Sequence, residues 1–251
     1  TMDTITATVS AAGLVTAVRN GEVLIIATSG SGSATATVTV AQVASSVTLS
    51  PDSVSFTSLA DTATLVATVK DAGGTTMSGA AVTWTTSSDN AVATVSTGGL
   101  VTAVGNGTAT ITATSGSVSG SAAVTIAQVA SSVTLSPTSL SFSSLADTTT
   151  LTATVKDADG SAISGATVTW SSSDTDIATV SLGGLVTAIG NGTATITASS
   201  GAASATASAT INQVPNSVTL SPTTLILVSL GDTATLTALV KDANDSTIAS
   251  P

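Results

Sequence analysis

The fold of this chain is decided by residues 99–114, which read GLVTAVGNGTATITAT. Small or branched apolar residues alternate with threonine along this stretch, and a period of two is typical of half-buried β-strands. Asn106-Gly107 lies between two alternating runs, and Asn-Gly favours a two-residue turn in which both positions need positive φ. We therefore expect two antiparallel strands joined by a tight hairpin.

The same stretch recurs twice, as GLVTAVRNGEVLIIAT at residues 13–28 and as GLVTAIGNGTATITAS at residues 184–199. Trp84 likewise recurs as Trp170, 86 residues later. The phrase that begins at Val47, VTLSP, is found again from Val133 and from Val218. A fixed period of this size indicates a string of like modules, each of which contacts mainly its neighbours.

Matching the repeats to one another locates the module boundaries. Residues 43–128 and 129–213 are predicted to be complete modules, residues 1–42 the C-terminal half of another, and residues 214–251 the N-terminal half of a further one. The two halves together lack only the equivalent of residues 81–86, which contains the tryptophan. The links between modules contain no run of glycine or proline, so we expect a semi-rigid rod.

Short strands between frequent turn signals, in modules of this size, predict an antiparallel β-sandwich. No segment has helical periodicity, so the expected fold class is all-β, with tandem immunoglobulin-like β-sandwich domains in a rod. Trp84 and Trp170 lie in alternating strands, which favours a place in the core over stacking on sugar rings. Val104 and Ile189 are also predicted to be buried in the cores of their modules.

The composition argues against an enzyme. Histidine, cysteine and tyrosine are all absent, so the chain lacks the usual general base, thiol nucleophile and zinc ligands. A serine–lysine pair is conceivable, but Lys70, Lys156 and Lys241 recur at one strand end of every module and look like scaffold. We therefore predict no catalytic residues and no resident cofactor.

The charge balance narrows the partners and the location. Fourteen acidic residues against four basic ones give a net charge of −10, which repels nucleic acid and anionic membrane surfaces. The longest apolar runs, residues 23–27 and 225–228, are far shorter than the roughly 20 residues that cross a bilayer, so no direct membrane insertion is expected. A polar but weakly charged surface of threonine, serine and asparagine suits an extracellular or bacterial cell-surface protein.

Several motifs of each complete module resemble a known family. They are WTTSSD from Trp84, ATV from Ala93, GLVTAV from Gly99 and GTATITA from Gly107, with counterparts WSSSD, ATV, GLVTAI and GTATITA in residues 170–198. These motifs resemble the bacterial immunoglobulin-like group 2 (BIG2) repeat. The resemblance implies surface adhesins of the intimin and invasin kind, other exported proteins, or phage appendages. In these proteins the repeat serves mostly as a stalk or spacer and occasionally as a binding tip.

Four large aliphatic side chains replace polar ones in the two half-modules. Leu24 and Ile26 stand where the complete modules have threonine, and Ile226 and Val228 stand where they have serine or threonine. Soluble monomers tend to avoid such patches, which usually mark contact surfaces. We therefore hypothesise that these four residues lie at a subunit or module interface.

Two alternative partners could cover that interface. In one, the chain binds itself head to tail, and the half-modules of successive subunits complete a shared sandwich within a filament. In the other, the chain is an excision from a longer array, and adjacent repeats cover the patch. The favoured function is a non-catalytic extracellular structural protein that forms a rod or a self-assembling filament. The alternative is the stalk or binding module of a surface adhesin or phage appendage that recognises a receptor or a carbohydrate.

A calcium site near Asp157 and Asp159 is the weaker interpretation of the sequence DADG at residues 157–160. Calcium requires six to eight oxygen ligands, and the equivalent segments read DAGG from Asp71 and DAND from Asp242. Because the pattern changes between repeats, a turn between strands is the favoured interpretation.

Overall fold

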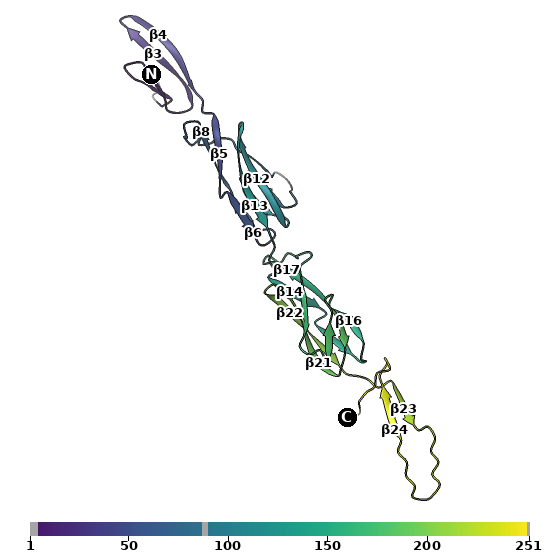
Figure 1. Ribbon diagram of the computed structural model, residues 1–251. Helices are drawn as coiled ribbons and strands as arrows, with labels where there is room; N and C mark the ends of the chain where they lie inside the picture. Colours follow the sequence, from purple (N-terminus) through teal and green to yellow (C-terminus); the bar gives the residue numbers. More distant parts are fainter. Residues whose placement is uncertain (1–4, 87–89, 250–251) are drawn as a thin grey trace. The chain divides into compact units, whose positions relative to one another are not determined.

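The computed structural model describes residues 5–86 and 90–249, and every regular element in these ranges is a β-strand (Figure 1). Two compact units are distinguished. The first contains Thr1–Phe56 and Thr62–Ile126, and the second contains Thr57–Asp61 and Ala127–Pro251. The all-β prediction is confirmed. None of the described residues belongs to a helix long and apolar enough to cross a membrane.

The first unit begins with four strands that form two antiparallel pairs. They are β1 (Ala7–Val9), β2 (Val15–Ala17), β3 (Gly21–Ser29) and β4 (Gly32–Val40). Strand β1 pairs with β2, and β3 pairs with β4 over nine residues from Gly21↔Val40 to Ser29↔Gly32. We call residues 1–42 the N-terminal half-module.

The rest of the first unit is a complete β-sandwich. Its strands are β5 (Ala44–Ser50), β6 (Ser53–Phe56), β7 (Thr62–Thr64), β8 (Val66–Asp71), β9 (Thr83–Thr86), β10 (Ala93–Val95), β11 (Leu100–Ala103), β12 (Gly107–Ser115) and β13 (Val118–Ile126). One layer is a sheet in the order β6-β13-β12-β9, and the other contains the pair β5-β8 and the sheet β10-β11-β7. Strand β6 runs parallel to β13, whereas the other pairs are antiparallel.

The second unit repeats this arrangement. Its strands are β14 (Ser132–Ser136), β15 (Ser139–Phe142), β16 (Thr148–Thr150), β17 (Thr152–Lys156), β18 (Thr169–Ser172), β19 (Ala178–Val180), β20 (Leu185–Ala188), β21 (Gly192–Ser200) and β22 (Ala203–Ile211). The sheet order β15-β22-β21-β18 matches that of the first unit. Residues 214–251, the C-terminal half-module, add the antiparallel pair of β23 (Ser217–Ser221) and β24 (Thr237–Lys241).

The alternating pattern of the sequence correctly identifies the inward side of most strands. Ile111 and Ile196 are completely buried, and each buried large aliphatic side chain stabilises the fold by roughly 1.5–3 kcal/mol. Trp84 and Trp170 are half-buried and pack against the cores of their modules, as expected.

The prediction was wrong for two core positions. Val104 and Ile189 are each 43% exposed, whereas Val101 and Val186 are completely buried. The inward positions of β11 are Val101 and Ala103, so Val104 has the opposite parity and lies beyond the end of the strand.

The prediction of a tight hairpin at Asn106-Gly107 was also wrong. These residues connect β11 in one sheet to β12 in the other, and of the two only Gly107 has a positive φ, of 140°. A Cβ at Gly107 would lie 3.1 Å from the Val92 side chain, so glycine is needed for both conformation and packing. The turn between β12 and β13 is instead made at Gly116, where φ is 60°.

Candidate functional site

An aspartate lies at the end of one core strand in three of the repeats and accepts several hydrogen bonds. These residues are Asp71, Asp157 and Asp242. In each, Oδ1 accepts the backbone N–H of the residue four positions later, at 2.8 Å, 2.8 Å and 2.9 Å respectively. The aspartate therefore closes the turn after β8, β17 and β24 from its own side chain.

The other carboxylate oxygen accepts a hydrogen bond from a glutamine that lies two residues after the last strand of the preceding repeat. Gln42 donates Nε2–H to Asp71 Oδ2 at 2.8 Å, and Gln213 does the same to Asp242 at 2.9 Å. Gln128 makes the equivalent bond to Asp157 at 2.8 Å. The contact thus links two successive repeats through side chains.

In two of the three cases, an asparagine side chain orients the glutamine. Asn191 Oδ1 accepts the Gln213 backbone N–H at 2.8 Å, and its Nδ2 donates to Gln213 Oε1 at 2.9 Å. Asn20 makes the same two contacts to Gln42, at 2.7 Å and 3.2 Å. Because Gln Oε1 is then an acceptor, its Nε2 is left to point at the aspartate.

A backbone amide supplies a further donor to the same carboxylate in the second unit. The Leu59 N–H lies 3.0 Å from Asp157 Oδ2, and the Leu145 N–H lies 2.9 Å from Asp242 Oδ2. Leu59 and Leu145 belong to the loops after β6 and β15, in the repeat that precedes each aspartate. We call each set of aspartate, glutamine and leucine amide a junction.

Asp157 and Asp242 remain ionised although they are only 2% and 1% exposed. For Asp157, the hydrogen bond from Gln128 is the largest influence and lowers the pKa of the carboxyl group. For Asp242, burial opposes ionisation, but the hydrogen bonds from Gln213 and three backbone amides together outweigh it and lower the pKa. Charge-assisted hydrogen bonds to the ionised form therefore hold both carboxylates in place.

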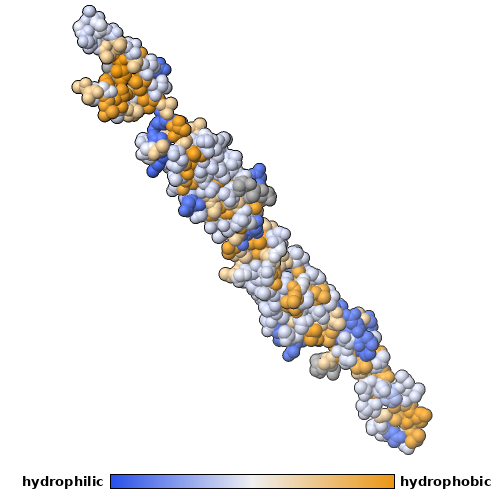
Figure 2. Space-filling model, turned by 45° about the horizontal axis from the view of Figure 1, so that its top comes forward, coloured by the Kyte–Doolittle hydropathy of each residue, from blue (hydrophilic) through white to orange (hydrophobic). Residues whose placement is uncertain are grey.

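The four predicted interface residues lie in the two half-modules. Leu24 is 40% exposed and Ile26 is half-buried, while Ile226 and Val228 are 88% and 87% exposed. Figure 2 shows apolar residues gathered on the surface of both half-modules. Their assignment to an interface stays a prediction, and Leu24 and Ile226 belong to different units.

In the segment suggested as a calcium loop, the carboxylate of Asp157 already accepts hydrogen bonds from N–H groups. Both oxygens of Asp157 accept N–H groups, from Ser161 on one side and from Gln128 and Leu59 on the other. Asp159 is exposed, and partial desolvation together with the charges of Asp61 and Asp157 raises its pKa. Within residues 5–86 and 90–249, no group of three or more acidic side chains is placed to hold a metal ion.

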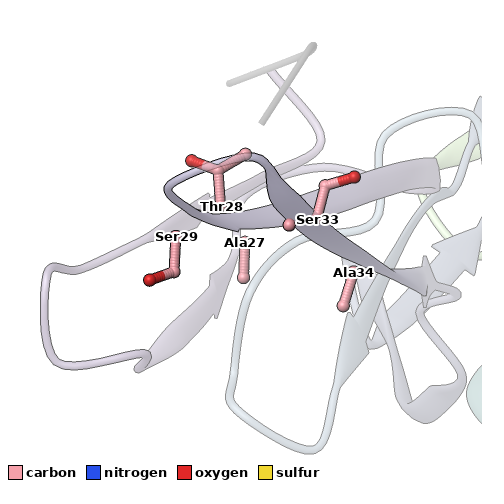
Figure 3. A pocket seen from close by; sticks show the side chains of 6 residues that line it. Ala27, Thr28, Ser29, Ser33 and Ala34 are labelled. Carbon is pink, nitrogen blue, oxygen red and sulfur yellow. The ribbon is translucent and has the colours of Figure 1, made fainter.

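A hollow of about 390 Å³ lies on the β3–β4 hairpin (Figure 3). The methyl groups of Ala27 and Ala34 point to the same side of the hairpin there. The equivalents of Ala27 in the complete modules, Ala113 and Ala198, are completely buried. The hollow therefore lies on the face of the hairpin that corresponds to the inner face of the sheet in the complete modules.

The junctions were missed from the sequence, although part of their signal is visible. Asparagine, glutamine and aspartate recur at the same three positions of each repeat, at Asn20, Gln42 and Asp71 in the first case. Their recurrence marks them as a set, but only the structure shows that they touch.

Comparison with known proteins identifies relatives of this chain. Residues 43–126 and 129–211 match the family model described as bacterial Ig-like domain (group 2). Ice-binding protein 1 of Shewanella frigidimarina (strain NCIMB 400) is 34% identical over 250 residues, which are 98% of this chain and 27% of that protein. The chain thus spans about a quarter of the length of this curated relative.

Two solved structures also match, at low identity. Domains 1–6 of the surface layer protein SbsC are 19% identical, with a TM-score of 0.34, over 96% of this chain and 41% of that one. Repeats EC22–24 of mouse cadherin-23 are 14% identical, with a TM-score of 0.33, over 74% of this chain and 72% of that one.

Proposed function

Because the chain belongs to the bacterial Ig-like domain (group 2) family, we propose that it is a non-catalytic structural protein of the cell exterior. Its tandem modules act as a rod or filament, in which neighbouring subunits complete the terminal half-modules. The coarse part of this assignment, an extracellular structural or adhesive role, also agrees with relatives named for ice binding and surface layers.

The observation that carries the proposal is the repeated junction. Gln213 leaves the end of one repeat and binds Asp242 of the next, and Leu145 of the earlier repeat binds the same carboxylate. Because both contacts converge on one buried charge, bending between the repeats would leave that charge without its partners. Such a joint suits a spacer that transmits position along an array.

The composition supports the absence of catalysis. The chain has no histidine or cysteine, and it contains a single glutamate, Glu22. The aspartates with the largest sets of partners, Asp157 and Asp242, bind N–H groups that hold the fold together. They are thus engaged in structure and offer no free base for proton transfer.

Concentration-dependent light scattering of the purified chain tests the filament. We expect the mass to grow with concentration and negative-stain images to show fibres with a beaded profile. A constant monomer mass over the whole range would refute self-assembly and leave a stalk. Protease treatment of intact producing cells tests the exterior location, because a surface protein is degraded while cytosolic proteins survive.

The alternative is a binding module, and the name of the ice-binding relative is the specific observation in its favour. That similarity covers 27% of the relative, so its binding activity is a proposal for this chain. Thermal hysteresis and binding to a glycan array distinguish the two functions. We expect neither signal, and a reproducible signal in either assay would favour the binding module.

A further inference from the structure

We propose that the glutamines at positions 42 and 213 protect the Asn-Gly pairs at residues 20–21 and 191–192 from deamidation, and that deamidation of Asn191 weakens the hold of Gln213 on Asp242. The modification therefore converts a tightly held joint into a looser one. This inference does not depend on self-assembly, because every contact that carries it lies within one chain.

The glycine of each pair is required by the backbone. Gly21 and Gly192 have φ values of 148° and 141°, in a region that favours glycine over every residue with a side chain. A Cβ at Gly192 would also lie 2.7 Å from the end of the Ile177 side chain. The fold thus places a glycine directly after each of these asparagines.

That glycine makes the asparagine chemically labile, because it has no Cβ to hinder attack by its own nitrogen. In deamidation, the backbone nitrogen of the glycine bonds to the asparagine Cγ. The Cγ–Nδ2 bond breaks, and Nδ2 leaves as ammonia with the proton of that nitrogen. Water then opens the cyclic imide, adding hydroxide to one carbonyl carbon and returning a proton to the nitrogen, which gives aspartate or isoaspartate.

Gln213 opposes the first step by holding both ends of the Asn191 amide. Asn191 Oδ1 accepts the Gln213 backbone N–H at 2.8 Å, and Nδ2 donates to Gln213 Oε1 at 2.9 Å. Ring closure draws Cγ to the Gly192 nitrogen and expels Nδ2, so it has to break this two-point contact. Asn191 is itself exposed, so these contacts, and not exclusion of water, provide the protection.

The backbone on the other side of the reacting atoms is held as well. Gly192 begins β21 and pairs opposite Ile211 of β22, and Gly21 begins β3 and pairs opposite Val40 of β4. An imide ring at either glycine would have to distort the start of a nine-residue strand pair. Strand pairing therefore adds to the protection that the glutamine gives.

Asn20 has the same contacts in a weaker form. Its Oδ1 accepts the Gln42 backbone N–H at 2.7 Å, but its Nδ2 lies 3.2 Å from Gln42 Oε1. Gln42 is half-buried, whereas Gln213 is only 9% exposed. Both differences make Asn20 the less protected of the two sites.

The hydrogen bonds of the later junction run in one direction. Asn191 Nδ2 donates to Gln213 Oε1, and Gln213 Nε2 donates to Asp242 Oδ2 at 2.9 Å. An ionised carboxylate only accepts hydrogen bonds, so Asp242 requires Nε2 and leaves Oε1 for Asn191. The orientation of the glutamine amide is therefore set from both ends.

Deamidation removes one of these two ends. An ionised aspartate at position 191 has no donor for Gln213 Oε1, so two oxygens meet where an N–H and an oxygen met before. Gln213 is then repelled on one side while it still donates to Asp242 on the other. Asp242 is 1% exposed, so water cannot readily replace the donor when the glutamine moves away.

The protection is tested by ageing the full chain in mildly alkaline buffer and measuring deamidation of each asparagine by peptide mass spectrometry. We expect both sites to react about tenfold or more slowly in the folded chain than in denaturant. Gln213→Ala should accelerate Asn191 by about two- to tenfold, the factor that corresponds to one hydrogen bond, and leave Asn20 unchanged. Gln42→Ala should do the reverse, so each variant is the matched control of the other.

Three outcomes would overturn the protection. Equal rates in the folded and the denatured chain would show that the contacts protect neither site. An unchanged rate at Asn191 in Gln213→Ala would show that strand pairing alone protects it. Equal acceleration of both sites by one variant would show a general loosening of the fold.

The effect on the joint is tested with Asn191→Asp, which has the side chain of the aspartate product. Leu145 and Ser246 donate their backbone N–H groups to Asp242, and we expect hydrogen exchange of both amides to become several-fold faster. The Leu59 amide donates to Asp157 at the other junction, and its exchange should not change. Unchanged exchange at Leu145 and Ser246 would overturn the loosening of the joint.

The role of the glutamine as the link is tested by a double-mutant cycle. In the Gln213→Ala background, Asn191→Asp should have little further effect on exchange at Leu145 and Ser246, because the side chain that transmits the change is gone. Equal accelerations by Asn191→Asp in the two backgrounds would show that Gln213 does not carry the effect.

Discussion

The two complete junctions of the second unit have the same anchor but differ at one neighbouring residue. At the later junction, Asn244 donates Nδ2–H to Asp147 Oδ1 and to Leu145 O, both at 2.8 Å. At the earlier junction, Asp159 takes the place of Asn244 and approaches Asp61, the equivalent of Asp147. An amide thus makes an attractive second contact where a carboxylate makes a repulsive one.

The comparison separates the part of the junction that both joints share from the part that differs between them. Asp157 and Asp242 are both buried, both accept glutamine and leucine donors, and both have a lowered pKa. The position of Asp159 and Asn244 is exposed and changes between repeats. The central aspartate is therefore the common anchor, and the peripheral position sets how strongly each joint is held at a given pH.

Removal of the central aspartate should have the largest effect. Asp242→Ala leaves the N–H groups of Gln213, Leu145 and Ser246 without their acceptor in a buried site. We expect the unfolding midpoint in calorimetry to fall by about 5 °C or more. Asp157→Ala should have a similar effect, because its anchor has the same partners.

The matched control is Asp245→Asn. Asp245 makes an ion pair with Lys241 at 2.9 Å, but its side chain is 81% exposed, and asparagine also tolerates its φ of 63°, so little change is expected. If Asp242→Ala were as stable as Asp245→Asn, the buried anchor would not be what stabilises the joint.

Acid should weaken both junctions. The pKa values of Asp157 and Asp242 are lowered on folding from an ordinary value of 3.8. The stability they contribute is therefore complete above that value and is lost as the pH falls through the lower values of the folded state. Midpoints measured from pH 7 to pH 2 should drop below about pH 4, and the drop should be smaller in Asp242→Ala.

The sequence predicts the strands of this molecule better than it predicts their connections. Alternation in residues 108–114 places Ile111 inward, because the period of two is a local property of the chain. The prediction at Asn106-Gly107 was wrong because it assumed that the two residues make only local turn contacts. In the equivalent position, the Asn191 side chain binds Gln213, 22 residues away.

The junction is harder to predict because its contacts span a repeat. Leu59 reaches Asp157 across 98 residues, and it does so with a backbone amide that any residue but proline could provide. No side-chain signature of the contact therefore exists in the sequence. The apolar half-modules were visible from the sequence, yet which of their residues face inward follows only from the strand register.

Exchange of the peripheral residue should change one junction at a time. Asp159→Asn replaces repulsion at Asp61 with the contact seen between Asn244 and Asp147, so we expect the midpoint to rise by roughly 1–3 °C at pH 7. Asn244→Asp should lower it by a similar amount. The first shift should shrink as the pH falls through the raised pKa of Asp159, because the protonated carboxyl group can donate a hydrogen bond as the amide does. The second should shrink for the same reason as the carboxyl group introduced at position 244 is protonated. Shifts that do not depend on pH would show that charge is not their cause.

Calcium should have the smallest effect on the unfolding midpoint, and it gives a second test of the difference between the two junctions. The carboxylates of Asp61 and Asp159 are the only feature of the earlier junction that a cation would favour, since both oxygens of Asp157 already accept N–H groups. Millimolar calcium should therefore move the midpoint by less than about 1 °C relative to a chelator, as expected for weak occupancy. A larger shift that disappears in Asp159→Asn would instead establish that a cation binds between Asp61 and Asp159. The contact between these two carboxylates would then be a cation-binding site.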